Sequence, residues 1–298
     1  MSSVLSIKNV VKEYSGYKAV NNASFEVPKG SIFGLLGPNG AGKTSLIRII
    51  TRITAADSGQ VLLNGKDISE TAIRDVGYLP EERGLYKKMM VGEQLVYLSQ
   101  LKGLTKDEAG REIKYWLEKF DIKDWWTKKI EELSKGMQQK VQFIATVLHK
   151  PSLIILDEPF TGLDPVNTNL MKEEIYRLNE EGTSIIFSTH RMEQVEEICK
   201  DIVLVEKGQV ILSGSVSDVK EQFKEGLFNV NTQSPITTGG GSYDFKQSGD
   251  DGTIIKIKTG NTANDVLSEI IQSGNTIKAF NEVLPTLNDI FIKQVNRI

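Results

Sequence analysis

Cysteine and histidine are scarce in this sequence. Its 298 residues include one cysteine, Cys199, and two histidines, His149 and His190. A single cysteine excludes a disulfide framework within the chain, which is typical of proteins from a reducing compartment. We expect Cys199 to be an inert packing residue, because buried thiols rarely react.

Long apolar runs are missing as well. A membrane-spanning helix needs about 18 apolar residues without interruption, but the best runs here, such as residues 153–156, are short and end at acids. The first ten residues also lack the basic and then apolar pattern of a signal peptide. We therefore expect a chain that is soluble by itself, so that any membrane function requires a partner that spans the bilayer.

No charge of one sign dominates the sequence. There are 36 Lys and Arg against 39 Asp and Glu, a formal net charge of −3, and 39% of the residues are hydrophobic. These values are ordinary for a globular protein, and they leave no basic excess for binding nucleic acid. No nucleic-acid partner is therefore expected. The length favours one large domain together with a small one.

Short apolar runs alternate with helical patterns along much of the chain. Runs at residues 31–36, 153–156, 184–188 and 202–205 predict buried strands, and the helical stretches between the last three favour parallel pairing. Between about 86 and 150 the periodicity is mostly helical. The sequence therefore predicts an α/β organisation with a helical insertion.

A change in composition divides the chain near its last quarter. Residues 231–252 are rich in Gly, Ser and Thr and are predicted to form a loop. Strand and helix patterns resume beyond it. We predict a large domain over residues 1–222, with a helical subdomain at about 86–150, and a small α/β accessory domain over residues 223–298.

A glycine-rich segment follows the first of these buried runs. It matches the pattern G-x-x-x-x-G-K-[ST] and comprises Gly37, Pro38, Asn39, Gly40, Ala41, Gly42, Lys43 and Thr44. Glycines let the backbone curl so that successive N–H groups face phosphate oxygens, and the helix that starts near Lys43 adds its positive end. Lys43 is expected to reach the β- and γ-phosphates, and the Thr44 hydroxyl to ligate Mg²⁺. Ser45 completes the predicted nucleotide site.

Two acids end a buried strand further along the chain. Asp157 and Glu158 follow the run at residues 153–156. In an open α/β sheet, ligands bind at the carboxyl ends of the strands. Asp157 is therefore expected to meet the Mg²⁺ that Thr44 holds, and Glu158 to polarise the water that attacks the γ-phosphate.

A third segment sets this chain apart from other proteins with a phosphate-binding loop. Residues 133–140 read Leu-Ser-Lys-Gly-Met-Gln-Gln-Lys and open a helical pattern upstream of Asp157. The segment resembles the L-S-G-G-Q signature motif of ABC ATPases. The resemblance implies that Ser134 and the backbone at Gly136 bind the γ-phosphate of an ATP molecule held by a second subunit.

Other landmarks of the ABC family occur in the same order. Tyr14 resembles the aromatic residue that stacks on adenine, although Tyr17 is a competitor for this role. Asp164 ends the run at residues 161–164, which resembles the D-loop at the dimer interface. His190 follows a predicted strand, as the switch histidine of the family does, and is expected to contact the γ-phosphate.

The sequence departs from the family pattern at two places. Lys135 and Met137 replace a glycine and the glutamine of the signature, and Glu81 stands where the family has the Q-loop glutamine. A carboxylate at this position still offers oxygen atoms to water and to Mg²⁺, but it adds negative charge near the phosphates. Both departures resemble NatA-like (sodium-extrusion-type) bacterial exporters, as do the runs at residues 78–86 and 285–291.

The resemblance implies a P-loop NTPase of the ABC type, with a mixed sheet core, an antiparallel β subdomain and a helical subdomain. It implies an ATPase that uses ATP and Mg²⁺, with Lys43, Glu81, Glu158 and His190 as catalytic residues. The expected partners are a separate transmembrane permease subunit and a second copy of the chain, or a homologous ATPase subunit, in an ATP-sandwich dimer. The expected location is cytoplasmic, peripheral on the inner face of the cell membrane, and export is the expected direction.

Two other functions compete with that of a transporter motor. Soluble ABC proteins that act on ribosomes or DNA carry two cassettes or long coiled coils, and neither is visible in this sequence. A regulatory protein that binds ATP without turnover draws its only support from the altered signature and from Glu81. An ATPase assay separates that alternative from a transporter motor.

Overall fold

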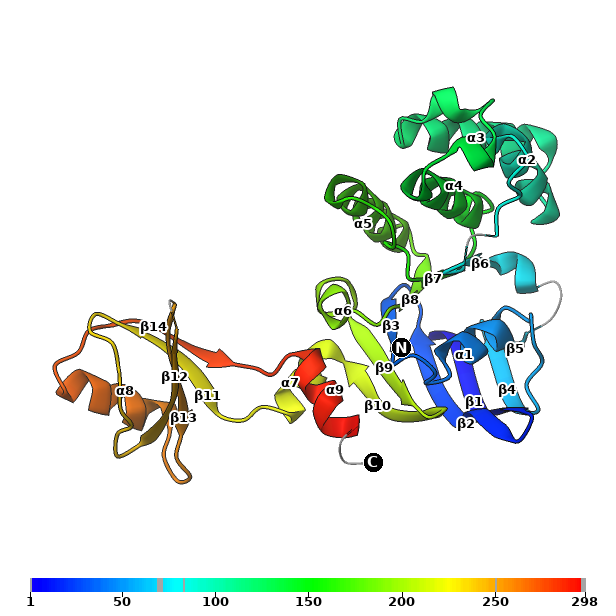
Figure 1. Cartoon of the computed structure of the whole chain (residues 1–298). Coiled ribbons are helices and arrows are strands. Elements are labelled where there is room, and N and C mark those ends of the chain that lie inside the picture. Colours follow the sequence, from blue (N-terminus) through cyan, green and yellow to red (C-terminus); the bar gives the residue numbers. More distant parts are fainter. Residues whose placement is uncertain (1, 69–71, 83, 250, 296–298) are drawn as a thin grey trace. The chain divides into compact units, whose positions relative to one another are not determined.

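The computed structural model describes residues 2–68, 72–82, 84–249 and 251–295. It divides the chain into two compact units, residues 1–215 and residues 216–298 (Figure 1). Among the helices of the described residues, none combines the length and the apolar character needed to cross a membrane.

The central sheet of the first unit is mixed. Its strand order is β10-β9-β3-β8-β7-β6, and all pairs are parallel except β10 with β9. The strands are β3 (Ile32–Leu36), β6 (Val76–Leu79), β7 (Leu153–Asp157), β8 (Ser184–Ser188), β9 (Asp201–Glu206) and β10 (Gln209–Ser215). Every residue of β3, β7 and β8 is buried, as expected for parallel strands covered on both faces.

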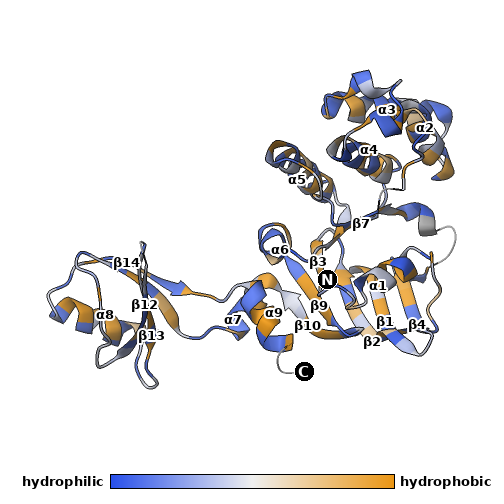
Figure 2. Ribbon diagram, viewed as in Figure 1, coloured by the Kyte–Doolittle hydropathy of each residue, from blue (hydrophilic) through white to orange (hydrophobic). Residues whose placement is uncertain are grey.

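A second, antiparallel sheet has the order β2-β1-β4-β5. It contains β1 (Ser3–Tyr14), β2 (Tyr17–Pro28), β4 (Ser58–Leu63) and β5 (Lys66–Asp67). Its apolar residues share one core with helix α1 (Lys43–Ile50) and with the central sheet. Figure 2 shows the apolar residues of this unit gathered on its strands. This core explains why the strands around the glycine-rich segment hold a fixed position.

Helices occupy the middle part of the sequence of the first unit, as the periodicity predicts. They are α2 (Val91–Leu101), α3 (Lys106–Lys119) and α4 (Lys135–Val147), with 3₁₀ turns at η1 (Ala72–Asp75), η2 (Lys123–Trp125) and η3 (Ile130–Glu132). Thr105 and Glu108 form a capping box that starts α3, in which each residue accepts the other's backbone N–H. Two further helices, α5 (Pro165–Glu180) and α6 (Met192–Ile198), follow β7 and β8 along the chain.

The second unit is a four-stranded antiparallel sheet with helices. Its order is β12-β13-β11-β14. The elements are α7 (Val216–Gln222), β11 (Leu227–Thr232), β12 (Tyr243–Gly249), β13 (Gly252–Ile257), α8 (Ala263–Gln272), β14 (Ile277–Val283) and α9 (Leu287–Val295). A separate small core lies between this sheet and α8, around Val230, Ile255 and Val266.

Two sequence-based expectations need correction here. Residues 231–252 are not loop throughout, because β12 lies within them and pairs with β13 at the edge of the sheet. Tyr243 is buried in the core despite the Gly- and Ser-rich composition around it. The division of the chain also falls after Ser215 rather than after residue 222, because α7 packs against α9 of the second unit.

Candidate functional site

The glycine-rich segment forms the turn between β3 and α1. Gly37, Gly40 and Gly42 have φ angles of 148°, 80° and 108°, which favour glycine. A Cβ atom on Gly42 would lie 2.2 Å from the carbonyl oxygen of Ala19, and one on Gly37 would lie 2.3 Å from that of Val205. The loop therefore requires glycine both for its backbone angles and for its close packing, at the N-terminus of a helix where anions bind.

Lys43 extends across this loop. Its Nζ atom donates to the carbonyl oxygens of Gly37 at 2.6 Å and of Pro38 at 3.0 Å. Burial lowers the pKa of Lys43, and the nearby charges of Asp157 and Glu158 oppose that effect. The ammonium group thus lies near the carboxylates of Asp157 and Glu158 and also contacts the glycine-rich loop.

The two acids lie where β7 ends, next to β8. Asp157 is buried and accepts a hydrogen bond of 2.8 Å from Ser188 Oγ. Burial raises the pKa of Asp157, and the hydrogen bond from Ser188 opposes the rise. Glu158 has a φ angle of 49°, and its N–H donates to the carbonyl oxygen of Ser188 at 2.9 Å. This left-handed backbone turns the Glu158 side chain away from the strand direction.

Glu158 is held by the segment that follows β8. Its Oε1 atom lies 2.7 Å from Nδ1 of His190 and accepts the His190 backbone N–H at 2.8 Å. Its Oε2 atom accepts from Thr189 Oγ1 at 3.1 Å. The carboxylate is largely buried, whereas the His190 ring is exposed. The adjacent parallel strands β7 and β8 therefore fix an acid and a histidine beside each other.

One cavity of about 350 Å³ brings most predicted site residues together. Its lining comprises Tyr14, Tyr17, Ala19, Pro38, Asn39, Gly40, Ala41, Gly42, Lys43, Thr44, Ser45, Glu81, Asp157, Glu158 and His190. Both tyrosines lie at its mouth and are exposed, and Tyr17 Oη donates to the Gly40 carbonyl at 3.3 Å. The structure therefore leaves both tyrosines as candidates for contact with a base.

Four predicted residues do not line this cavity, namely Gly37, Ser134, Gly136 and Asp164. Gly37 precedes the lining residues of the glycine-rich segment. Ser134 is the exposed N-cap of α4, where its Oγ atom accepts from the Met137 N–H at 3.3 Å. Asp164 is the exposed N-cap of α5. Gly136 lies against the loop before α5, since a Cβ atom there would be 3.0 Å from the Gly162 carbonyl oxygen. Ser134, Gly136 and Asp164 therefore form a separate group at the starts of two helices, where Ser134 and Asp164 face solvent.

Sequence reasoning missed Ser188 and Thr189. Both are fully buried and orient the two acids from the neighbouring strand. Their only signal was their place directly before His190 in the sequence.

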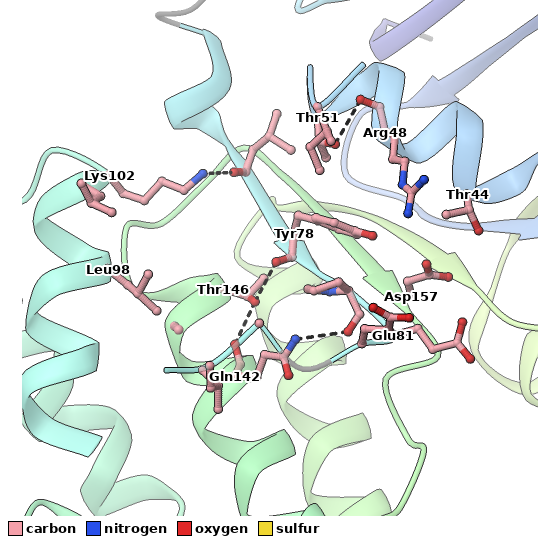
Figure 3. Close-up of a pocket in the computed structure, with 18 of the residues that line it drawn as sticks. Thr44, Arg48, Thr51, Tyr78, Glu81, Leu98, Lys102, Gln142, Thr146 and Asp157 are labelled. Atoms are coloured by element: carbon pink, nitrogen blue, oxygen red, sulfur yellow. Dashed lines mark hydrogen bonds between the residues drawn. The ribbon is translucent and has the colours of Figure 1, made fainter. Parts of the chain in front are cut away.

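A larger cavity of about 760 Å³ adjoins the first and shares Thr44, Glu81 and Asp157 with it. Figure 3 shows Arg48 of α1 and Lys102 projecting into it from different elements. Its other walls include Leu85, Leu98, Leu101, Gln142, Thr146 and His149. Gln142 Nε2 donates to the Pro80 carbonyl at 3.2 Å, so α4 is tied to the segment that carries Glu81.

Burial dominates the electrostatics of that larger cavity. It raises the pKa of Tyr78 to about 12, with the charge of Asp157 adding to the rise. It lowers the pKa of His149 to about 4, and the charge of Lys102 adds to that fall.

Comparison with known proteins identifies the family. Residues 20–161 match the model for ABC transporter, and residues 214–295 match that for the C-terminal domain of ATP-binding protein DrrA1-3-like. The uncharacterized ABC transporter ATP-binding protein YhaQ of Bacillus subtilis is 43% identical over 99% of both chains. The chain belongs to the ABC transporter family.

Two other relatives of this ABC ATP-binding subunit also come from Bacillus subtilis. The linearmycin resistance ATP-binding protein LnrL is 36% identical over 72% of this chain and 70% of its own. The ABC transporter ATP-binding protein NatA is 33% identical over 74% of this chain and 92% of its own. A solved structure, described as an ATP binding subunit of an ABC transporter, superposes with a TM-score of 0.70 at 30% identity, covering 74% of this chain and 93% of that one.

These findings confirm the predicted P-loop fold of the ABC type and the prediction of an ATP-binding subunit. The subunit is an ATPase whose hydrolysis is coupled to transport, as members of its family are. The predicted subfamily and the roles of individual residues stay predictions.

Proposed function

We propose that this subunit binds ATP in the 350 Å³ cavity and drives a membrane exporter by hydrolysing it. One observation carries the proposal: Lys43, Asp157, Glu158 and His190 line a single cavity at the carboxyl ends of parallel strands. Ligands of open α/β sheets bind at this edge. The loop before α1 supplies N–H groups for the phosphates, and Tyr14 or Tyr17 supplies a ring for the base.

The residues around Thr44 suit Mg²⁺. Thr44, Glu81 and Asp157 offer a hydroxyl and two carboxylates to one region of the cavity, and oxygen atoms are the ligands that Mg²⁺ prefers. When bound, Mg²⁺ neutralises charge on the phosphates. Ser188 orients Asp157 for this role, because its hydroxyl donates a hydrogen bond to one of the two carboxylate oxygens of Asp157.

Glu158 is proposed as the group that receives a proton from the attacking water. Two donors from Thr189 and the His190 backbone fix the orientation of its carboxylate. The His190 ring occupies the exposed side of that carboxylate and lines the cavity, where it can contact a γ-phosphate. Lys43 stabilises the negative charge that spreads over the transferred phosphoryl group.

Ser134, Gly136 and Asp164 are proposed to act on a second copy. They are grouped at two helix N-termini, and Ser134 and Asp164 are exposed. A helix N-terminus attracts anions. We infer that the group meets the γ-phosphate held by another copy, or by a homologous ATPase subunit, so that two nucleotides are enclosed between two chains.

The 760 Å³ cavity is the proposed docking region for a separate transmembrane subunit. It reaches the nucleotide cavity through Glu81, and exposed apolar side chains such as Tyr86 and Leu101 lie at or near it. We infer that the subunit works at the inner face of the cell membrane. Export is supported by the linearmycin resistance relative, and a NatA-like assignment by the NatA relative together with Glu81 and Lys135.

A substitution at Glu158 tests this proposal. Glu158→Gln keeps the shape of the side chain but removes the proton acceptor, so the hydrolysis rate of the purified chain should fall by at least ~100-fold. ATP should still bind, and the dimer should persist longer in ATP. Steady-state phosphate release, nucleotide titration and light scattering measure the three quantities. Wild-type protein that binds no ATP, or a variant that hydrolyses at the wild-type rate, would contradict the assignment.

A further inference from the structure

Helix α5 carries a buried carboxylate outside the nucleotide cavity. The Glu174 side chain is 6% exposed, and two cations contact the same oxygen, Oε2. Lys119 Nζ lies 2.9 Å away and belongs to the last turn of α3. Arg177 Nε also lies 2.9 Å away but belongs to α5 itself. The Lys119–Glu174 pair therefore joins two helices, whereas Arg177 balances the charge of Glu174 from within its own helix.

Trp116 connects this ion group to a third helix. Its ring centroid lies 5.9 Å from Lys119 Nζ and 5.4 Å from Arg177 Cζ, within the range of cation–π attraction. The same ring packs edge-on against Phe143 of α4, with centroids 6.0 Å apart and planes at 82°. Phe143 is fully buried. We call Trp116, Lys119, Glu174 and Arg177 the Glu174 cluster, and it holds α3, α4 and α5 together.

Near its N-terminus, α4 also contacts the loop that leads into α5. A Cβ atom on Gly136 of α4 would lie 3.0 Å from the Gly162 carbonyl oxygen. Gln139 Nε2 of α4 donates at 2.9 Å to the carbonyl oxygen of Pro159, the residue after Glu158, and this hydrogen bond is buried. At 1.5 Å per residue, Phe143 lies about 6 Å beyond Gln139 along α4, and Glu174 lies about 14 Å beyond Pro165 along α5. Contacts at these two levels restrict the angle between α4 and α5.

We infer that Lys119 and Glu174 are positioning residues that set the angle between α4 and α5. They thereby hold Ser134, at the start of α4, in a defined place relative to the segment of Glu158 and Asp164. The inference rests on the proposed function, because it assigns Ser134 to the nucleotide of a second copy. Cutting the link between α3 and α5 leaves the hydrogen bond of Gln139 as a pivot, about which α4 tilts. Ser134 then meets the second copy less often in the productive geometry.

Binding of nucleotide within one copy does not involve this cluster. None of its four residues lines the 350 Å³ cavity. A positioning role therefore separates two quantities that general destabilisation would change together. The affinity of one copy for ADP should stay constant, while ATP-driven pairing and turnover should fall.

Lys119→Gln is the sharpest variant for this test. It removes the charge that joins α3 to α5, and it leaves Glu174 paired with Arg177, so the chain should stay folded. We expect kcat to fall about fivefold or more, the size of a typical coupling between sites, with ADP affinity from calorimetry within about twofold of wild type. In a Glu158→Gln background, light scattering should show that more ATP is needed to form the dimer.

Matched variants complete the experiment. Glu181→Gln removes another carboxylate partner of Arg177, at the C-cap of α5, without changing the Lys119–Glu174 pair, and kcat should not change. Lys119→Arg keeps the charge and should restore most of the rate. Trp116→Phe loosens the contact with Phe143 without removing an ionic group, and it should lower kcat while ADP affinity holds.

The outcomes separate this inference from the proposed function. Wild-type turnover in Lys119→Gln, or a loss of ADP affinity in parallel with kcat, overturns the positioning role. If Lys119→Gln does not fold, Trp116→Phe decides in the same way, since unchanged turnover or a parallel loss of ADP affinity in that chain also overturns the positioning role. A wild-type chain that binds no nucleotide contradicts the proposed function instead, whatever the variants do.

Discussion

His149 is a buried titratable residue that the proposed chemistry does not use. It lines the larger cavity, and its Nε2 atom lies 3.4 Å from the Val76 carbonyl oxygen. Burial lowers its pKa from 6.5 to about 4, so the folded chain favours the neutral ring. The unfolded chain binds the proton first as the pH falls. This site therefore costs stability between pH 6.5 and about 4.

The substitution His149→Gln measures how much His149 contributes to the pH dependence of stability. We expect the free energy of unfolding of the wild-type chain to fall more steeply than that of His149→Gln between pH 7 and 4, with a difference of up to about 3 kcal/mol. Urea unfolding at several pH values measures both curves. Parallel curves would show that the ring titrates normally in the folded chain.

At the scale of single residues, the candidate site could be predicted from the sequence where its residues are neighbours in the chain. Lys43 and Thr44 sit in a contiguous pattern, and Asp157 and Glu158 end a recognisable strand. The supporting residues Ser188, which ends β8, and Thr189, which follows it, are each 31 residues away from the acid they contact. Serine and threonine at a strand end have many roles, so only the pairing of β7 with β8 shows this one.

The turn between β3 and α1 depends on its glycines as backbone elements. In Gly42→Ala the new Cβ atom meets the backbone oxygen of Ala19 at 2.2 Å, at a φ angle of 108°. We expect a loss of at least about 2 kcal/mol in the free energy of unfolding, from backbone strain and overpacking together, and a loss of nucleotide binding.

Gly65→Ala is the matched control for that variant. Gly65 also has a positive φ, 79°, but a Cβ atom there meets nothing within 4 Å. Strain alone should cost about 1 kcal/mol, and nucleotide affinity should be unchanged because Gly65 lies outside the cavity. Equal losses in the two variants would mean that the contact with Ala19 relaxes freely.

At the scale of elements, hydrophobic periodicity and the residues at element ends predicted helices and strands well, whereas local composition was misleading. The helix predicted to start near Lys43 spans Lys43–Ile50, and the strand at 184–188 has the predicted bounds. Strand β12 was missed because edge strands tolerate polar residues and glycine near a turn. Its register comes from pairing with β13, which the sequence of β12 alone does not reveal.

The two units of the molecule each have their own core. The core of residues 1–215 includes residues from both of its sheets and α1, and that of residues 216–298 surrounds Val230, Ile255 and Val266. The sequence indicated two units from a change in composition, but it could not place the boundary. The assignment of α7 depends on its packing with α9, a helix far away in the chain.

Because each unit has its own core, we expect the two units to unfold in separate thermal transitions. In a Glu158→Gln chain, MgATP at 100 times its dissociation constant should stabilise the first unit by about 2.7 kcal/mol and raise its Tm by roughly 5–10 °C. The transition of residues 216–298 should stay in place, since its core contains no residue of the nucleotide cavity. Calorimetry of the full chain and of residues 1–215 alone assigns the two transitions, because the shorter chain lacks one of them. If both transitions of the full chain move together with MgATP, the second unit senses the nucleotide, and the accessory domain takes part in the ATPase cycle.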